Sequence, residues 1–155
     1  MKKPNFFIVG AAKCGTTSLY RYLRQHPDVF MPEQKEPNFF GSDLSYRFPR
    51  ISQARYLSCF AKAKGETRIG EATTIYLYSE KAAEEIKAFS PEAKIIIMLR
   101  NPVDVLYSYH SQQLYSGNED IPDFEEALRA EVDRLGRLLG RDLSHWSRAG
   151  GEQAS

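Results

Sequence analysis

The sequence predicts an α/β fold in which helices cover both faces of a parallel β-sheet. The segments 6–9 and 94–99 are almost continuously apolar, which is typical of strands buried on both faces. Segments with helical spacing of their apolar residues, such as 16–25 and 79–89, alternate with these runs. Strands that alternate with helices favour parallel pairing, because a parallel connection needs a crossover that a helix usually supplies.

The expected elements follow from local signals along the chain. The first helix ends before Pro27, because the residue before a proline disfavours helical backbone. Ser79 suits the cap of the third helix, and Pro102 takes the first helical position that proline prefers in the fourth. The expected strands are 6–9, 29–31, 69–71 and 94–99. The expected helices are 16–25, 52–63, 79–89, 102–115 and 123–139.

Length and charge narrow the function classes. The chain has 155 residues, of which 42% are hydrophobic and 26% charged, so a single domain over 1–155 is expected. The 21 basic and 20 acidic residues nearly balance, so no nucleic-acid-binding surface is expected. The stretch from about residue 140 to 155 loses its apolar period and is expected to be a poorly ordered tail.

Cysteine usage and hydropathy favour a cytoplasmic protein that binds neither metal nor membrane. Cys14 and Cys59 form no CxxC pair, which argues against a zinc site and for a reducing compartment. No apolar run approaches the roughly 18 residues that a membrane-spanning helix needs. The opening resembles a signal peptide only superficially, since Lys13 ends its short apolar run.

The segment from Phe6 to Leu19 is the most informative one. It predicts a buried strand, a turn of small residues and the first turn of a helix. Backbone N–H groups at a helix start have no partners within the helix, and the helix dipole adds positive charge there. Lys13 adds a full charge, and Gly15 lets the backbone approach an anion closely. The segment predicts a phosphate- or sulfate-binding site; the alternative is an ordinary turn with an incidental lysine.

The glycine spacing nearly matches the phosphate loop of nucleoside triphosphatases, G-x-x-x-x-G-K-[ST]. Gly10 and Gly15 are in place, but Thr16 stands where that loop has its lysine. The lysine of this loop, Lys13, lies two residues before Gly15. A loop without the usual lysine is not expected to hold the β- and γ-phosphates of ATP in the usual way. The site therefore fits a phosphate-type anion and does not favour ATP hydrolysis.

Sequence blocks along the chain resemble the sulfotransferases that use 3′-phosphoadenosine 5′-phosphosulfate (PAPS), especially the branch of heparan-type and bacterial carbohydrate sulfotransferases. The blocks occur in the family's order between about residues 5 and 130, at 10–18, 35–40, 70–73 and 95–108. The resemblance implies a P-loop-like three-layer fold. It also implies metal-free transfer of a sulfuryl group from PAPS to a hydroxyl or amine of an acceptor, a small molecule or a carbohydrate.

The resemblance also assigns residues to the donor. Lys13 would neutralise charge at the 5′-phosphosulfate and on the leaving phosphate, and the residues after it would supply further hydrogen-bond donors. Those residues are Cys14, Gly15, Thr16, Thr17 and Ser18. Arg100 and Ser108 would hold the 3′-phosphate, a task that suits the planar fork of arginine. Independently of the family, Lys13 and Arg100 each follow an apolar strand, which predicts that they share one edge of the sheet.

Glu36 is the residue that the resemblance implies as the general base, which takes the acceptor proton. The alternatives are an ordinary solvated loop carboxylate, or His110 as the base, because other sulfotransferase branches use histidine. Arg100 has the alternative of an ion pair with Asp104. Cys14 has the alternative of a redox or nucleophilic role near the helix start.

Two departures from the family pattern bear on activity. Heparan-type enzymes carry a lysine where this chain has Ala72, so one cation is missing unless Lys35 or Arg68 replaces it. Family domains usually run well past this length, so a partial domain without the C-terminal strand, helices and glycine-rich loop is expected. Two other functions stay open. One is a kinase or nucleoside triphosphatase of the same fold; the other is a non-catalytic nucleotide-binding fragment that self-associates through its sheet edge to form a homo-oligomer.

Overall fold

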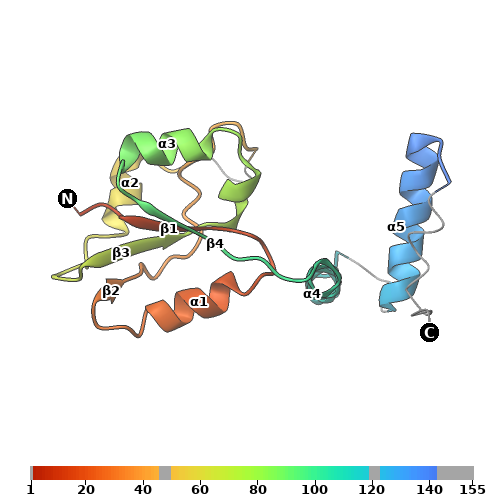
Figure 1. Ribbon diagram of the computed structural model, residues 1–155, viewed down its shortest axis with the longest axis horizontal. Helices are drawn as coiled ribbons and strands as arrows, with labels where there is room; N and C mark the ends of the chain where they lie inside the picture. Colours follow the sequence, from red (N-terminus) through yellow and green to blue (C-terminus); the bar gives the residue numbers. More distant parts are fainter. Residues whose placement is uncertain (1, 46–49, 119–122, 143–155) are drawn as a thin grey trace, which may run out of the picture. The chain divides into compact units, whose positions relative to one another are not determined.

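The computed structural model describes residues 2–45, 50–118 and 123–142, and the chain divides into two compact units. The first unit, Met1–Arg100, holds the sheet and its covering helices, and the second, Asn101–Ser155, holds the helices α4 and α5 (Figure 1). Most of the expected tail, from residue 143 onward, lies outside the described residues. The single-domain organisation stays a prediction.

The first unit is built on a parallel sheet, as the sequence predicts. Its strands in chain order are β1 (Phe6–Gly10), β2 (Val29–Phe30), β3 (Arg68–Ala72) and β4 (Lys94–Ile97). Their spatial order is β2-β3-β1-β4, and each neighbouring pair runs parallel. Ile8 in β1 lies opposite Ala72 of β3 and Ile96 of β4 in the register. The three longer strands therefore end at one common edge of the sheet.

Alternate residues of β1 face two separate cores. The helices of this unit are α1 (Thr16–Leu23), α2 (Gln53–Ser58), the 3-10 helix η1 (Thr74–Tyr78) and α3 (Ala82–Phe89). Phe7 and Val9 belong to the core that contains side chains of α2, η1 and α3, whereas Phe6 and Ile8 pack with Tyr20 of α1. Figure 1 shows α1 on one side of the sheet and α2 and α3 on the other. The predicted three-layer α/β fold is confirmed.

Two elements differ from the sequence prediction. The sequence predicts a helix over 52–63, but α2 ends at Ser58 and the chain continues in turns, with the Phe60 amide bonded to the Leu57 carbonyl at 3.1 Å. The 3-10 helix η1 has no counterpart in the prediction. The sequence predicts Ser79 as the cap of the next helix, but α3 begins only at Ala82 and its N-cap residue is Lys81. The Ser79 Oγ still accepts from the Ala82 amide at 2.8 Å.

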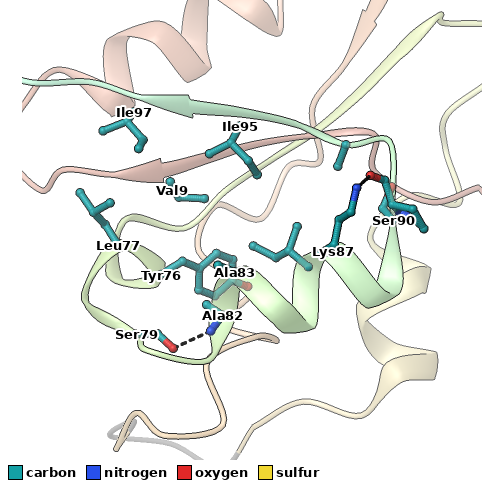
Figure 2. A pocket seen from close by; sticks show the side chains of 13 residues that line it. Val9, Tyr76, Leu77, Ser79, Ala82, Ala83, Lys87, Ser90, Ile95 and Ile97 are labelled. Atoms are coloured by element: carbon teal, nitrogen blue, oxygen red, sulfur yellow. Dashed lines mark hydrogen bonds between the residues drawn. The ribbon is translucent and has the colours of Figure 1, made fainter.

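The strand β4 lies at the edge of the sheet and has an exposed apolar face. Ile95 and Ile97 are 48% and 51% exposed, and with Val9 they line a groove of about 370 Å³. The other wall comes from η1 and α3, and Figure 2 shows Leu77 and Ala83 across the groove from these strand side chains. Self-association through this sheet edge stays a prediction.

Gly70 in β3 lies where the packing leaves no room for a side chain. A Cβ there would overlap the ring of Phe6 and the sulfur of Met31. Gly70→Ala is therefore expected to lower the free energy of unfolding by about 1–3 kcal/mol, the usual cost of overpacking. Gly65→Ala is the matched control, because nothing lies within 4 Å of a Cβ at Gly65. Denaturant unfolding of both variants checks this expectation, which fails if the two variants are equally stable.

The second unit contains α4 (Pro102–Tyr115) and α5 (Phe124–Leu139), as the sequence predicts. Asp123 caps α5, because its Oδ1 accepts a hydrogen bond from the amide of Glu126 at 2.8 Å. His110 of α4 is buried, and its ring packs against Phe124 with the ring centroids 5.4 Å apart. Among the described parts of both units, no helix combines the length and apolarity that crossing a bilayer requires.

Candidate functional site

The carboxyl ends of β1, β3 and β4 meet at one edge of the sheet. The Met98 amide donates to the Gly10 carbonyl at 2.8 Å, and the Ala11 amide donates back to the Met98 carbonyl at 2.8 Å. On the other side of β1, the Thr73 amide donates to the Ile8 carbonyl at 3.0 Å. The loops that follow these strands therefore leave the sheet side by side, which is where open parallel sheets bind ligands.

The loop between β1 and α1 presents Lys13 and the start of a helix. Lys13 is half-buried. Gly15 forms the N-cap of α1 in a left-handed conformation, with φ 83°, and has no side chain to cap the helix. Without that side chain, the amides of the first turn suit an anion from outside the chain. The local arrangement is the one that the sequence predicts.

The side chains at the start of α1 differ in exposure. Thr17 and Ser18 are exposed, so their hydroxyls can reach a ligand. Cys14 and Thr16 are buried, with exposed fractions of 7% and 4%. Cys14 is a free thiol, and its burial fits a small loop residue better than a reactive one. The accessible hydroxyls of this loop are therefore those of Thr17 and Ser18.

Backbone strain is concentrated in the loops at this edge. In the described part of the chain, the residues other than glycine with a left-handed backbone are Lys13, Glu36 and Asn38, with φ values of 63°, 58° and 53°. Such conformations cost of order 1–3 kcal/mol and cluster at functional sites. The Oδ1 atom of Asn38 is also buried without a hydrogen-bond partner among the described residues. This concentration of strain favours a functional role for both loops.

Glu36 lies at the same edge, on the loop that follows β2. Its amide donates to the carbonyl of Ala72, the last residue of β3, at 3.0 Å. Its Oε1 accepts hydrogen bonds from Lys35 Nζ at 2.5 Å and from Thr74 Oγ1 at 3.1 Å. The side chain is 36% exposed, so the carboxylate is both oriented and accessible. The structure thus places Glu36 and Lys13 at the ends of the neighbouring strands β3 and β1.

The same edge shows which cation can replace the lysine that is missing at Ala72. Ala72 itself is buried. Arg68 begins β3, which places it about 13 Å from Ala72 at the opposite end of the strand. Lys35 lies at the edge and forms an ion pair with Glu36. Of the two candidates that the sequence offers, Lys35 lies at this edge and Arg68 does not; the replacement of the lysine by Lys35 stays a prediction.

A buried carboxylate that sequence reasoning did not single out lies in β3, next to Ala72. Glu71 is 1% exposed and accepts hydrogen bonds from Tyr56 Oη at 2.6 Å and Thr73 Oγ1 at 2.5 Å. Tyr76 Oη makes a longer bond of 3.4 Å to the same oxygen as Tyr56. Burial raises the pKa of Glu71 to about 7, although these hydroxyl groups oppose the shift. The only signal in the sequence is an acidic residue between buried strand positions.

Comparison with known proteins identifies the family. The model of the sulfotransferase domain matches residues 3–145. The chain belongs to the sulfotransferase domain family. Among solved structures, a sulfotransferase from Alicyclobacillus acidocaldarius is similar with a TM-score of 0.77 and 37% sequence identity. The match covers 96% of this chain and 64% of that one, and it confirms the fold that the resemblance implies.

Curated members of the sulfotransferase family are similar at the level of sequence. Carbohydrate sulfotransferase 15 of Homo sapiens is 32% identical, over 81% of this chain and 30% of its own length. Heparan sulfate glucosamine 3-O-sulfotransferase 6 of Homo sapiens is 35% identical, over 94% of this chain and 43% of its own length. A membrane-associated sulfotransferase of Dictyostelium discoideum is 33% identical, over 84% and 28%. The chain thus spans less than half the length of these curated relatives.

The remaining predicted residues of this sulfotransferase domain follow β4. Arg100 is exposed and lies two residues after Met98, so its backbone leaves the sheet at the same edge as Lys13. Ser108 is partly buried on α4 of the second unit, and its pairing with Arg100 stays a prediction. His110, the alternative base, packs against Phe124 of the same unit, and its role stays a prediction. Within the described ranges, no group of His, Cys, Asp and Glu side chains is arranged to hold a metal ion.

The raised pKa of Glu71 predicts a pH-dependent stability. In the unfolded chain the carboxyl ionises near its ordinary pKa of 4.5, whereas in the folded chain it keeps its proton up to about pH 7. The folded state therefore binds more protons between these values. Through Glu71, the free energy of unfolding falls by up to about 3 kcal/mol as the pH rises across this window. Glu71→Gln is expected to remove this contribution, because an amide does not ionise.

Denaturant unfolding at several pH values tests the expectation, and the measured quantity is the difference between wild type and Glu71→Gln. Carboxylates elsewhere, such as Asp43, whose pKa the Ser79 hydroxyl lowers by a hydrogen bond, contribute equally to both proteins. Identical pH dependence in the two proteins would show that Glu71 does not carry a proton in the folded state.

Proposed function

We propose that this chain is a sulfotransferase that transfers a sulfuryl group from PAPS to a hydroxyl or amine of a carbohydrate acceptor. The observation that carries the proposal is the position of Lys13 and Glu36 at one sheet edge, at the ends of neighbouring strands and each in a strained conformation. Sulfuryl transfer needs a cation for the leaving phosphate and a base for the acceptor proton. Relatives named as carbohydrate and heparan sulfate sulfotransferases support a carbohydrate acceptor.

The donor is expected to bind over the loop between β1 and α1. The amides at the start of α1 and the exposed hydroxyls of Thr17 and Ser18 suit the oxygens of a 5′-phosphosulfate. Lys13 holds the negative charge that grows on the phosphate as the sulfur–oxygen bond breaks. The backbone of Arg100 follows β4 at the same edge, and its planar fork binds the 3′-phosphate. The part of Ser108 in holding that phosphate stays a prediction from the sequence.

Glu36 is the general base of the proposed reaction. Its carboxylate takes the proton of the acceptor hydroxyl or amine while that atom forms its bond to sulfur. The bond between sulfur and the phosphate oxygen breaks, and the nucleotide leaves as 3′-phosphoadenosine 5′-phosphate. Lys35 and Thr74 fix the orientation of the carboxylate through its Oε1 atom, which keeps the base aligned with the acceptor.

Transfer of labelled sulfate from PAPS to polysaccharide tests the proposal. Unsulfated heparan- and chondroitin-type chains serve as acceptors, and ATP–Mg²⁺ is offered separately to test for a kinase or nucleoside triphosphatase. We expect label in the polysaccharide and no consumption of ATP, because Thr16 stands in place of the phosphate-loop lysine. Nucleotide binding with no label in any acceptor would instead point to a non-catalytic nucleotide-binding chain.

A further inference from the structure

A group of buried polar side chains lies in the core below the carboxyl end of β3. We call Tyr56, Glu71, Thr73 and Tyr76 the Glu71 cluster. Within it, Glu71 accepts hydrogen bonds from Tyr56 at 2.6 Å and from Thr73 at 2.5 Å. Burying a carboxylate is costly even with good partners, and an apolar side chain in its place is often neutral or stabilising. Stability alone therefore does not explain the presence of Glu71 in the core.

Tyr76 connects the Glu71 cluster to the loop that carries Glu36. Its hydroxyl accepts hydrogen bonds from the amides of Phe39 at 2.9 Å and Phe40 at 3.2 Å, and it donates to Glu71 Oε2 at 3.4 Å. A phenolic hydroxyl has one proton and two lone pairs, so these bonds use its full capacity. Because Glu71 accepts the hydroxyl proton of Tyr76, that proton points into the core. Both lone pairs of the Tyr76 oxygen are then available to the amides of Phe39 and Phe40.

Two successive residues of β3 hold the segment 36–40. The carbonyl of Ala72 accepts from the amide of Glu36 at 3.0 Å. Glu71, the residue before it, accepts from the Tyr76 hydroxyl, which in turn accepts from the amides at the other end of the segment. Both attachments lie on the segment that presents the Glu36 carboxylate to the sheet edge.

We propose that Glu71 is a positioning residue: by orienting the Tyr76 hydroxyl, it holds the segment 36–40 on the end of β3 and so fixes the position of the Glu36 carboxylate. The role of Glu36 as the base rests on the proposed function, whereas the attachment of the segment does not. A displacement of about 1 Å at a reacting group can cost about a hundredfold in rate. Loss of this attachment is therefore expected to appear in turnover and not in donor binding.

Tyr76→Phe and Tyr56→Phe form a matched pair of variants. Each removes one hydroxyl that donates to Glu71 Oε2 and keeps the aromatic ring in the core. Of the two hydroxyls, that of Tyr76 also accepts from the amides of the segment. We expect Tyr76→Phe to lower kcat between about ten- and a hundredfold with an unchanged KM for PAPS. Tyr56→Phe is expected to keep kcat close to that of the wild type.

Hydrogen exchange of the segment 36–40 is a second readout that needs no enzymatic activity. The amides of Phe39 and Phe40 are expected to exchange faster in Tyr76→Phe and at the wild-type rate in Tyr56→Phe. Glu71→Gln is expected to give an intermediate rate, because the glutamine oxygen accepts one hydrogen bond while its amide group can only donate.

The failure of this inference and that of the proposed function can be told apart. Faster exchange in Tyr76→Phe, in a protein that transfers no sulfate, would uphold the attachment and overturn the function. Unchanged exchange in Tyr76→Phe, or an equal loss of turnover in the two tyrosine variants, would overturn the positioning role. If Tyr76→Phe does not fold, Glu71→Gln decides the question, and wild-type exchange in that variant overturns the role.

Discussion

Glu36→Gln is expected to lower kcat by between about 10² and 10⁴, the usual contribution of a general base. The amide keeps the size of the side chain, and its oxygen can still accept from Thr74 Oγ1, which lies 3.1 Å from Oε1. It cannot take the acceptor proton. Affinity for 3′-phosphoadenosine 5′-phosphate is expected to stay unchanged, because the proposed donor site lies on the loop between β1 and α1. Steady-state kinetics and calorimetric titration measure the two quantities.

Glu33→Gln is the matched control for this prediction. Glu33 lies on the same loop, is exposed and pairs with Lys62 at 2.8 Å. Its replacement removes one negative charge close to Glu36 in the sequence and is expected to keep turnover near that of the wild type. Wild-type turnover in Glu36→Gln would rule out Glu36 as the base, and an equal decrease in both variants would indicate a general charge effect of the loop.

Lys13→Met is expected to lower kcat about 10²- to 10³-fold, the range for one group that stabilises developing charge. Methionine keeps most of the length of the side chain and removes its charge. Affinity for 3′-phosphoadenosine 5′-phosphate is also expected to fall, about 10- to 100-fold, as for the loss of one hydrogen bond to a charged group. The half-buried position of Lys13 beside the start of α1 is the structural reason for both effects.

Lys62→Met is the control for the loss of a lysine charge, because its side chain is 75% exposed and pairs with Glu33 on another part of the unit. This variant is expected to change neither kcat nor the affinity for 3′-phosphoadenosine 5′-phosphate. If Lys13→Met binds the nucleotide more weakly but keeps the wild-type kcat, Lys13 stabilises the bound nucleotide and not the charge that develops in the transition state. An unchanged affinity would remove Lys13 from the donor site altogether.

The sequence predicts the site best where a residue's position follows from the elements next to it in the chain. A strand, a turn of small residues and a helix start within one short segment determine where Lys13 lies, and β1 and α1 form as expected. The shared edge of Lys13 and Arg100 follows from parallel strand direction alone. The position of Glu36 does not follow from local sequence order, because its loop is attached to the sheet edge through Ala72, which lies far along the chain.

Sequence reasoning fails where the deciding contacts join distant elements. Glu71 lies among the buried residues of β3, and its partners Tyr56 and Tyr76 come from α2 and η1. The expected strand 69–71 already separates Arg68 from Ala72, but whether Lys35 approaches this edge depends on the path of its loop. Nothing in composition or periodicity carries that information, because strand register and loop path are properties of the folded chain.

Thermal unfolding with 3′-phosphoadenosine 5′-phosphate, with ATP–Mg²⁺ as the control, tests most directly whether this edge binds the proposed donor. A nucleotide at about 100 times its dissociation constant is expected to stabilise the fold by roughly 2.7 kcal/mol. We predict this shift for the 3′-phosphorylated nucleotide alone, and its loss in Arg100→Ala. A cooperatively unfolding protein with no shift, or with the same shift from ATP–Mg²⁺, would contradict the account.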